Sequence, residues 1–153
     1  MIPGFRRLSP QTVYQRFFTH MQEMPSDLAQ HFANVDHTRR QALIAELSLG
    51  ISYRPVGIAR YELMETEDQD SQAEVALLVF DEYQNKGVGH VLFHAILNEA
   101  AAHGIGLFCA DVLAENRRMI HLIHEDTSVR ESKTERGVTH FVFTMKQGAV
   151  AAQ

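Results

Sequence analysis

The stretch Val79-Phe80-Asp81-Glu82-Tyr83-Gln84-Asn85-Lys86-Gly87-Val88-Gly89 joins an apolar segment to an amphipathic one through a polar turn that contains glycine. The apolar segment, residues 73–80, is rich in Val and Leu and predicts a central strand that is buried on both faces. After the turn, apolar residues recur at helical spacing, which predicts a helix that ends before its C-cap, Gly104. We therefore expect a strand, a glycine turn and a helix at the centre of the fold.

Further helices and strands are predicted on both sides of this unit. The expected helices begin at Ser9-Pro10, at Ser26-Asp27 and at Glu115-Asn116, the last running to about His124, and the expected strands span 41–49, 55–64, 105–113, 128–131 and 138–145. This order predicts an α/β fold in which a mixed sheet is covered by helices on both faces.

Composition excludes several classes of protein. The chain has 153 residues, of which 45% are apolar, and no linker interrupts it, so we expect a single domain over residues 1–153. The formal charge is -5 without a basic run, which argues against nucleic acid as a partner. The longest apolar stretch, Val75 to Phe80, is far shorter than the roughly 20 residues of a membrane span. Met1 to Arg7 has no apolar signal core and Cys109 is alone, so we expect a cytoplasmic protein.

The turn around Gly87 and Gly89 suits a phosphate group. Glycines let the backbone approach a phosphate closely, and a helix N-terminus supplies N–H groups and partial positive charge. The stretch lacks the third glycine of the dinucleotide-binding fingerprint, and no Gly-Lys-Ser/Thr follows, so it is neither a Rossmann motif nor a P-loop. On the glycines alone, an ordinary tight turn between strand and helix stays open as an alternative.

The spacing Gln84-x-x-Gly87-x-Gly89 after a Val-rich strand resembles the acyl-CoA pyrophosphate loop of the GNAT superfamily of N-acetyltransferases. Residues 110–119 resemble the strand and helix start that follow this loop in the superfamily. Residues 8–18, Asp36 and residues 56–61 are similar to one branch, the bacterial protein-lysine acetyltransferases. The resemblance covers about Arg7 to His124 and implies a GNAT-type, mostly antiparallel central sheet with helices on both faces.

The resemblance also implies a cofactor site. Acetyl-CoA would be the co-substrate, without a metal. The backbone of Leu77, Leu78 and Val79, splayed by a bulge, would pair with the pantetheine arm, and the Val79 amide would face the thioester oxygen. Asn116 would hold the pantetheine or a water. The expected pyrophosphate cradle consists of Gln84, Asn85, Lys86, Gly87, Val88, Gly89 and His90.

Glu74 matches the glutamate that this branch uses as its general base. An amine with a pKa of about 10.4 must lose a proton before it attacks a thioester, and apolar neighbours raise the pKa of a carboxylate. The alternative is a solvent-facing glutamate at the start of a strand.

Three features depart from the family pattern. The tyrosine that many members place seven or eight residues after the asparagine is replaced by Ile123 and His124, so His124, His121 or an unassisted thiolate would complete the reaction. Glu125-Asp126-Thr127-Ser128 replaces the usual Gly-Phe. The family's first strand has no counterpart, which leaves open a misplaced start, a dispensable strand, or an edge covered by a second subunit in a homodimer.

The histidines, the cysteine and the acidic residues were also considered as functional groups. His90 and His94 are four residues apart, but no carboxylate or cysteine lies at matching spacing, so we expect no metal site. Cys109 lies in an apolar strand and is expected to be a buried structural thiol. Eight acidic residues and no Lys or Arg lie between Tyr61 and Asn85, which suggests either an acidic rim for cationic substrates or a solvated turn.

The implied function is acetyl-CoA-dependent acetyl transfer to a primary amine by direct attack, with protein lysine or a small cationic amine as the acceptor. Two alternatives stay open: a non-catalytic acyl-CoA-binding or regulatory module, and a small-molecule amine acetyltransferase.

Overall fold

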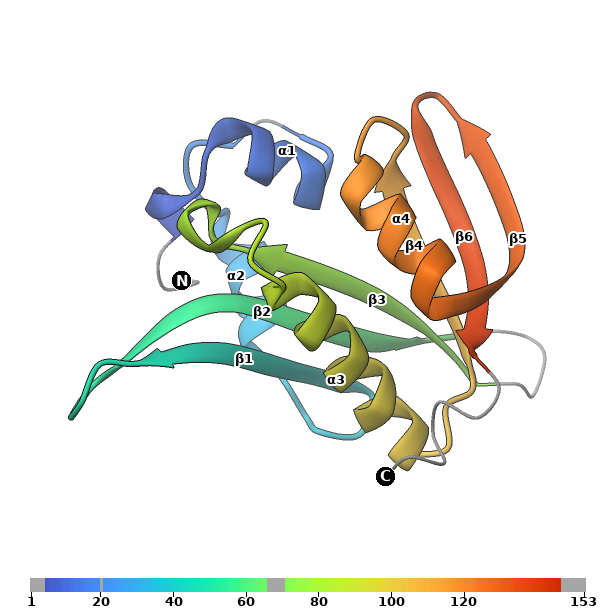
Figure 1. Cartoon of the computed structure of the whole chain (residues 1–153), viewed down its shortest axis with the longest axis horizontal. Coiled ribbons are helices and arrows are strands. Elements are labelled where there is room, and N and C mark those ends of the chain that lie inside the picture. Colours follow the sequence, from blue (N-terminus) through green and yellow to red (C-terminus); the bar gives the residue numbers. More distant parts are fainter. Residues whose placement is uncertain (1–4, 20, 66–70, 147–153) are drawn as a thin grey trace.

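The computed structural model describes residues 5–19, 21–65 and 71–146. In these residues, one six-stranded sheet runs through the molecule (Figure 1). The strand order is β1-β2-β3-β4-β6-β5, and every neighbouring pair is antiparallel except β3 and β4. The strands are β1 Arg40–Ser48, β2 Tyr53–Met64, β3 Gln72–Val79, β4 Leu107–Leu113, β5 Thr127–Glu135 and β6 Val138–Met145. The predicted mixed and mostly antiparallel sheet is confirmed.

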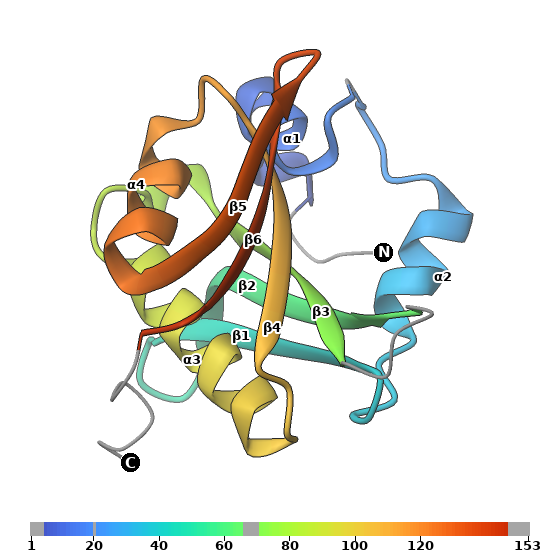
Figure 2. The same cartoon turned by 90° about the vertical axis from the view of Figure 1, so that its right-hand side faces the viewer.

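Helices cover both faces of this sheet, as predicted. The helices are α1 Pro10–Phe17, α2 Ser26–Ala33, α3 Val88–Ala102 and α4 Arg117–Asp126, with short 3-10 turns η1 Phe5–Arg7 and η2 Asp81–Tyr83. Figure 2 shows α3 and α4 on one side of the sheet and α1 and α2 on the other. No helix in the described part of the chain is both long and apolar enough to cross a membrane.

The main core lies between the sheet and the two helices α3 and α4. Phe93, Ile96, Phe108, Ile123 and Phe143 are completely buried in it. A smaller core lies under α1 on the opposite face and contains Phe5, Leu8, Val13, Leu78 and Phe80. Two cores on opposite faces hold the central strand β3 firmly, because its side chains alternate between them.

The approach of α3 to the sheet depends on Gly57 in β2. A Cβ atom at this position would lie 2.8 Å from Cδ1 of Leu92 and 3.0 Å from the carbonyl oxygen of Leu78. Only glycine fits between β3 and α3 at this distance, so this residue lets the long helix pack close to the strands.

Helix α1 begins as its sequence predicts and is tied to the end of β3. The Ser9 hydroxyl accepts a hydrogen bond from the Thr12 amide at 3.1 Å, and Pro10 occupies the first helical position. The Asp81 carboxylate accepts from the Ser9 amide at 2.9 Å and from the Thr12 hydroxyl at 3.0 Å. These bonds lower the pKa of Asp81, against the effect of its partial burial. Asp81 therefore anchors α1 beside the turn that follows β3.

Three local predictions need correction. The edge strand expected at 128–131 is longer, because β5 pairs with β6 from Thr127 to Glu135. Helix α4 ends at Asp126 instead of His124. Strand β3 is not buried on both faces throughout, since Glu74 is exposed. In the described residues no strand precedes Arg40, and β1 forms the edge of the sheet.

Candidate active site

Strands β3 and β4 are paired at one end and separate at the other. Their pairing is limited to Gln72 with Leu107, Ala73 with Phe108, and Glu74 with Cys109. Beyond Glu74 the strands diverge (Figure 1). A cleft of about 390 Å³ is lined by residues from both strands. A volume of this size is typical of small-molecule sites. Two strands of the sheet therefore form part of the wall of the candidate site.

The pairing of β2 with β3 decides which backbone groups face this cleft. The Phe80 amide donates to the Val56 carbonyl at 3.0 Å, on the β2 side. Because alternate residues direct their backbone groups to opposite sides of a strand, those of Leu78 point to β2, whereas those of Leu77 and Val79 point to the cleft. Leu77 and Val79 lie beyond the last pair with β4, so they can offer backbone groups to a bound molecule.

The bulge expected at residues 77–79 is wrong. β2 and β3 pair in continuous register from Gly57 with Val79 to Met64 with Gln72. The register shifts of this sheet lie in the β1–β2 and β5–β6 pairs. The opening of the site comes from the early end of the β3–β4 pairing, which a single sequence does not reveal.

The turn after β3 brings the N-terminus of α3 to the cleft. Asn85 has a φ of 61° and Gly87 a φ of 84°, so the chain reverses through two left-handed residues before the helix starts. The Val91 amide donates to the Gly87 carbonyl at 3.2 Å. The N–H groups of the preceding residues, including Gly89 and His90, therefore have no partner within α3 and suit an anion.

Not every residue of the predicted cradle borders the cleft. Gln84, Asn85, Gly87, Gly89 and His90 do. The Lys86 ammonium lies 5.7 Å from the centre of the Tyr83 ring, and the Val88 side chain packs against the main core. Of the cradle side chains, those of Lys86 and Val88 thus lie outside the cleft lining.

The Gln84 side chain fixes the turn. Its Nε2 donates to the Val79 carbonyl and to the Thr12 hydroxyl, both at 3.0 Å. Its Oε1 accepts from Arg118 Nη1 at 3.3 Å. The amide therefore links α1, β3 and α4 around the cleft.

Arg118 borders the cleft and was missed in the sequence analysis. The signal was available, because Arg117 and Arg118 occupy the first turn of α4, which has no acidic residue. A helix N-terminus disfavours cations, so two arginines there suggest an anionic ligand. The helix itself starts as predicted at Asn116, whose Oδ1 accepts from the Met119 amide at 3.3 Å and which also borders the cleft.

Glu74 lies at the point where β3 and β4 separate, and it borders the cleft. Partial loss of hydration raises its pKa, and the Asp111 carboxylate raises it further. The Arg16 guanidinium and His140 act in the opposite direction. The net result is a raised pKa, which makes this carboxylate a stronger base than a fully hydrated glutamate without charged neighbours.

Two side chains near Glu74 were also missed in the sequence analysis. Arg16 of α1 borders the cleft, and burial together with the nearby Arg60 lowers its pKa to about 10, so it remains a cation at neutral pH. Asp111 of β4 borders the cleft, and its Oδ1 lies 2.6 Å from Nδ1 of His140 on β6. Both residues lie in stretches that resemble the family, 8–18 and 110–119, but only the fold brings them to Glu74.

Cys109 is buried beside Glu74, as expected of a structural thiol. Burial raises the pKa of its thiol to about 11, and the carboxylates of Glu74 and Asp111 add to this effect. The thiol is therefore protonated at neutral pH and poorly suited to act as a nucleophile.

Of the two histidines considered as proton donors, His121 borders the cleft and His124 does not. His121 borders the cleft, and its Nε2 lies 2.8 Å from a carboxylate oxygen of Glu125. His124 is not among the cleft residues; its ring packs edge-on against Phe141 at 5.6 Å. Ile123 is completely buried.

Of the eight acidic residues between Tyr61 and Asn85, the five that the structure describes do not form an open acidic rim. Glu67, Asp68 and Asp70 lie outside the described residues. Asp81 anchors α1, and Glu74 alone of the five described acidic residues borders the cleft. The others are ion-paired: Glu62 with Arg40 and His31, Glu65 with Arg39, and Glu82 with Arg7 and Arg54.

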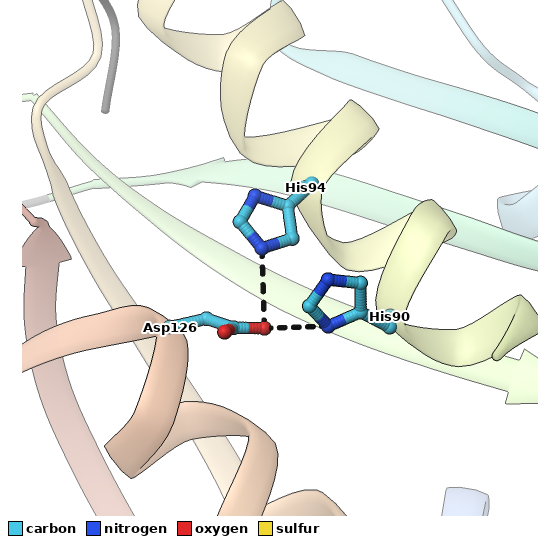
Figure 3. Close-up of side chains that lie close together, drawn as sticks. All are labelled: His90, His94 and Asp126. Carbon is cyan, nitrogen blue, oxygen red and sulfur yellow. Dashed lines mark ion pairs between the residues drawn. The ribbon is translucent and has the colours of Figure 1, made fainter.

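His90 and His94 have a carboxylate partner that their spacing did not reveal. Asp126, the last residue of α4, places its Oδ2 2.9 Å from His90 Nδ1 and 3.1 Å from His94 Nε2 (Figure 3). One ring nitrogen of His90, which was expected to face phosphate, is therefore directed toward α4.

Known proteins resemble this chain in sequence and in structure. The model of the acetyltransferase (GNAT) family matches residues 9–125. An acetyltransferase of Pseudomonas aeruginosa is 29% identical over 113 residues, which are 74% of this chain and 59% of that protein. The aligned region thus spans less than two thirds of this curated relative.

Among solved structures, the GNAT domain of S. lividans PAT matches with a TM-score of 0.77 and 28% identity, over 92% of this chain and 80% of that chain. The Salmonella typhimurium protein yncA with its cofactor acetyl-CoA matches with a TM-score of 0.63 and 18% identity, over 89% and 83%. A cAMP-binding acyltransferase of Mycobacterium smegmatis matches with a TM-score of 0.59 and 23% identity, over 99% of this chain and 43% of that chain. The last two similarities concern the fold alone.

Proposed function

Because the chain belongs to the GNAT acetyltransferase family, we propose that it transfers an acetyl group from acetyl-CoA to a primary amine by direct attack. The observation that carries this proposal is the cleft between β3 and β4. It has a carboxylate, Glu74, where the strands join and a helix N-terminus where they are apart. All six strands belong to one sheet, which supports a single folding unit as the setting of the site.

The residues of the cleft fit acetyl-CoA. A pantetheine arm has amide groups that can pair with the backbone of Leu77 and Val79 as a strand would. The N–H groups at the start of α3 and the Arg118 guanidinium suit the pyrophosphate. Asn116 borders the space between these two regions and can bind the arm through its amide nitrogen, which its capping hydrogen bond does not use.

Glu74 is proposed as the general base. Acetyl-CoA supplies an acetyl thioester whose carbon bonds to the amine nitrogen as the carbon–sulfur bond breaks. Before that step Glu74 accepts a proton from the acceptor ammonium, directly or through a water, and so frees the nitrogen lone pair. CoA leaves as a thiolate, the nitrogen releases its extra proton, and CoA ends as the free thiol. The raised pKa of Glu74 brings its basicity closer to that of the amine.

Two further residues support direct attack. The Val79 N–H points to the cleft and can stabilise the charge that develops on the thioester oxygen. The protonated thiol of Cys109 argues against an acetyl-cysteine intermediate, because only a thiolate attacks efficiently.

For the acceptor we propose the lysine side chain of a protein. Two observations support this: the 28% identity to the GNAT domain of S. lividans PAT, and the exposure of Glu74 to solvent at the end of the cleft. The carboxylates of Glu74 and Asp111 at this end favour a cationic group such as a lysine ammonium. We place this reaction in the cytoplasm, as the single cysteine favours.

The test is a panel of acceptors offered with acetyl-CoA, with release of free thiol as the measurement. Lysine peptides, polyamines and aminoglycosides separate a protein acceptor from a small amine. Turnover that Glu74→Gln abolishes would support the proposal. Binding of CoA without turnover of any amine would favour a non-catalytic module, and absence of CoA binding would refute both.

We also propose that a second copy of the chain covers the edge strand β1. The side chains of Ile44, Leu47, Leu49 and Tyr53 on and beside this strand are exposed by 58%, 44%, 53% and 66%. An exposed apolar edge is a liability that proteins usually cover. Sedimentation equilibrium should give the mass of two chains, and Leu49→Glu should give the mass of one.

A further inference from the structure

The side chains of His90, His94 and Asp126 converge on one point between α3 and α4 (Figure 3). His90 and His94 are one turn apart on α3, and their ring centres are 4.6 Å apart. Asp126 comes from the end of α4. One nitrogen of each histidine and one oxygen of Asp126 all lie within 4.8 Å of one another. Ligand atoms from two helices therefore lie close enough together to bind one metal ion.

The contacts are close but do not have hydrogen-bond geometry. The Asp126 side chain is only 10% exposed. Its Oδ2 is buried without a hydrogen-bond partner among the described residues, although two ring nitrogens lie within 3.1 Å of it. A carboxylate that is removed from water without aligned donors is costly. A cation bound by this oxygen and the two ring nitrogens would supply the positive charge that the buried carboxylate lacks.

We propose that His90 Nδ1, His94 Nε2 and the Asp126 carboxylate bind a divalent transition-metal ion of the zinc type. Two imidazoles and one carboxylate are a ligand set that Zn²⁺ takes with a fourth position left for water or another ligand. Ligand atoms at 2.0–2.2 Å from a tetrahedral ion lie roughly 3.3–3.5 Å apart. The distances of 2.9 and 3.1 Å between the nitrogens and Oδ2 need only a small adjustment to reach this spacing.

The ion would connect the two helices that border the acyl-CoA cleft. His90 belongs to the first turn of α3, next to the N–H groups proposed for the pyrophosphate, and it borders the cleft itself. Asp126 ends α4, whose first turn carries Arg118. A metal bond between these helices fixes the start of α3 relative to α4, so it holds the cofactor side of the site in place. The acetyl-transfer step itself does not use the ion.

The experiment measures zinc binding to the full chain without a histidine tag. The protein is treated with EDTA, dialysed and titrated with ZnCl₂ in a calorimeter. One ion per chain is expected, and His94→Gln and Asp126→Asn should each weaken binding by tenfold or more. The control is His103→Gln, at the end of α3, which lies 3.7 Å from Glu99 in a similar histidine–carboxylate pair and should leave zinc affinity unchanged.

Two further measurements make the result independent of folding defects and of activity. Circular dichroism checks that both variants are folded, and zinc should raise the unfolding temperature of the unchanged chain but not that of Asp126→Asn. Co²⁺ should give visible absorption bands that Asp126→Asn loses. The proposal is overturned if the unchanged chain binds zinc no more tightly than millimolar, or if both variants bind it as well as the control. The three side chains would then be an ion pair.

Discussion

Glu74 lies opposite Cys109 in the last residue pair that joins β3 to β4. The carboxylate is therefore fixed where the cleft begins, and the thiol beside it is held in its neutral form by burial. The same residue pair thus positions the proposed base, Glu74, and contains a thiol that is too weakly acidic to act as a nucleophile.

Glu74→Gln is expected to lower kcat/KM by about 10²–10⁴, because the amide cannot accept the amine proton. Affinity for CoA should be unchanged, since the cofactor groups are proposed to bind on the other side of the cleft. Thiol release and calorimetry measure the two quantities. Glu135→Gln, on the exposed part of β5, is the control. Equal activity of the two variants would contradict the role of Glu74.

The pH profile of kcat/KM should fall on the acid side as Glu74 takes up a proton. Its pKa is raised above 4.5, so this fall should begin above the pH at which an ordinary glutamate titrates. Asp111→Asn removes a negative neighbour and should move the fall to lower pH, whereas Arg16→Gln removes a cation and should move it to higher pH. Shifts in the same direction for both variants would contradict this assignment.

The same raised pKa predicts an effect on stability. A carboxyl whose pKa is higher in the folded state destabilises the fold once the pH rises above its unfolded value. Glu74→Gln should therefore unfold at a higher temperature than the unchanged chain at pH 8, and this difference should disappear at pH 4. Differential scanning calorimetry at the two pH values provides the measurement.

Gly87→Ala should weaken CoA binding about tenfold, since a left-handed residue costs alanine about 1–2 kcal/mol and the cradle depends on that turn. Binding of pantetheine, which lacks the pyrophosphate, should not change. Gly104→Ala is a matched control, because Gly104 has a φ of 81° against 84° for Gly87 and lies beyond the other end of α3. Loss of pantetheine affinity in Gly87→Ala would show a wider disturbance of the cleft.

Gly57→Ala should destabilise the fold by about 1–3 kcal/mol, because the new methyl group would press on Leu92 and on the Leu78 carbonyl. Gly106→Ala should be neutral or slightly stabilising, by up to about 1 kcal/mol, since no atom lies within 4 Å of its added Cβ. Urea denaturation compares the two variants.

Local chemistry made much of this fold predictable. Ser9 and Pro10 define the start of α1, Gly87 and Gly104 bracket α3, and the strand expected at 138–145 is β6. These signals depend on neighbours in sequence, and the order of elements then limits the architecture.

The features of the site that the sequence did not predict depend on contacts between residues that are far apart in the chain. Nothing in residues 72–79 shows that pairing with β4 stops at Glu74, and the expected bulge was a wrong explanation for the opening. Asp126 reaches His90 and His94 from a separate helix, so the spacing of the histidines could not reveal it. The sequence left open an acidic rim or a solvated turn, and it could not show that Glu62 and Glu82 pair with arginines from other elements.

With three residue pairs between β3 and β4, the sheet consists of two half-sheets, β1-β2-β3 and β4-β6-β5, that share a short seam. A pantetheine arm bonded to Leu77 and Val79 would continue that seam as an additional strand. The bound cofactor would then bridge the two half-sheets. In each catalytic cycle the two half-sheets would be bridged when the cofactor binds and separate again when CoA leaves. Hydrogen exchange at the Leu77 and Val79 amides should therefore slow when CoA binds, while exchange within the β1–β2 pair stays the same.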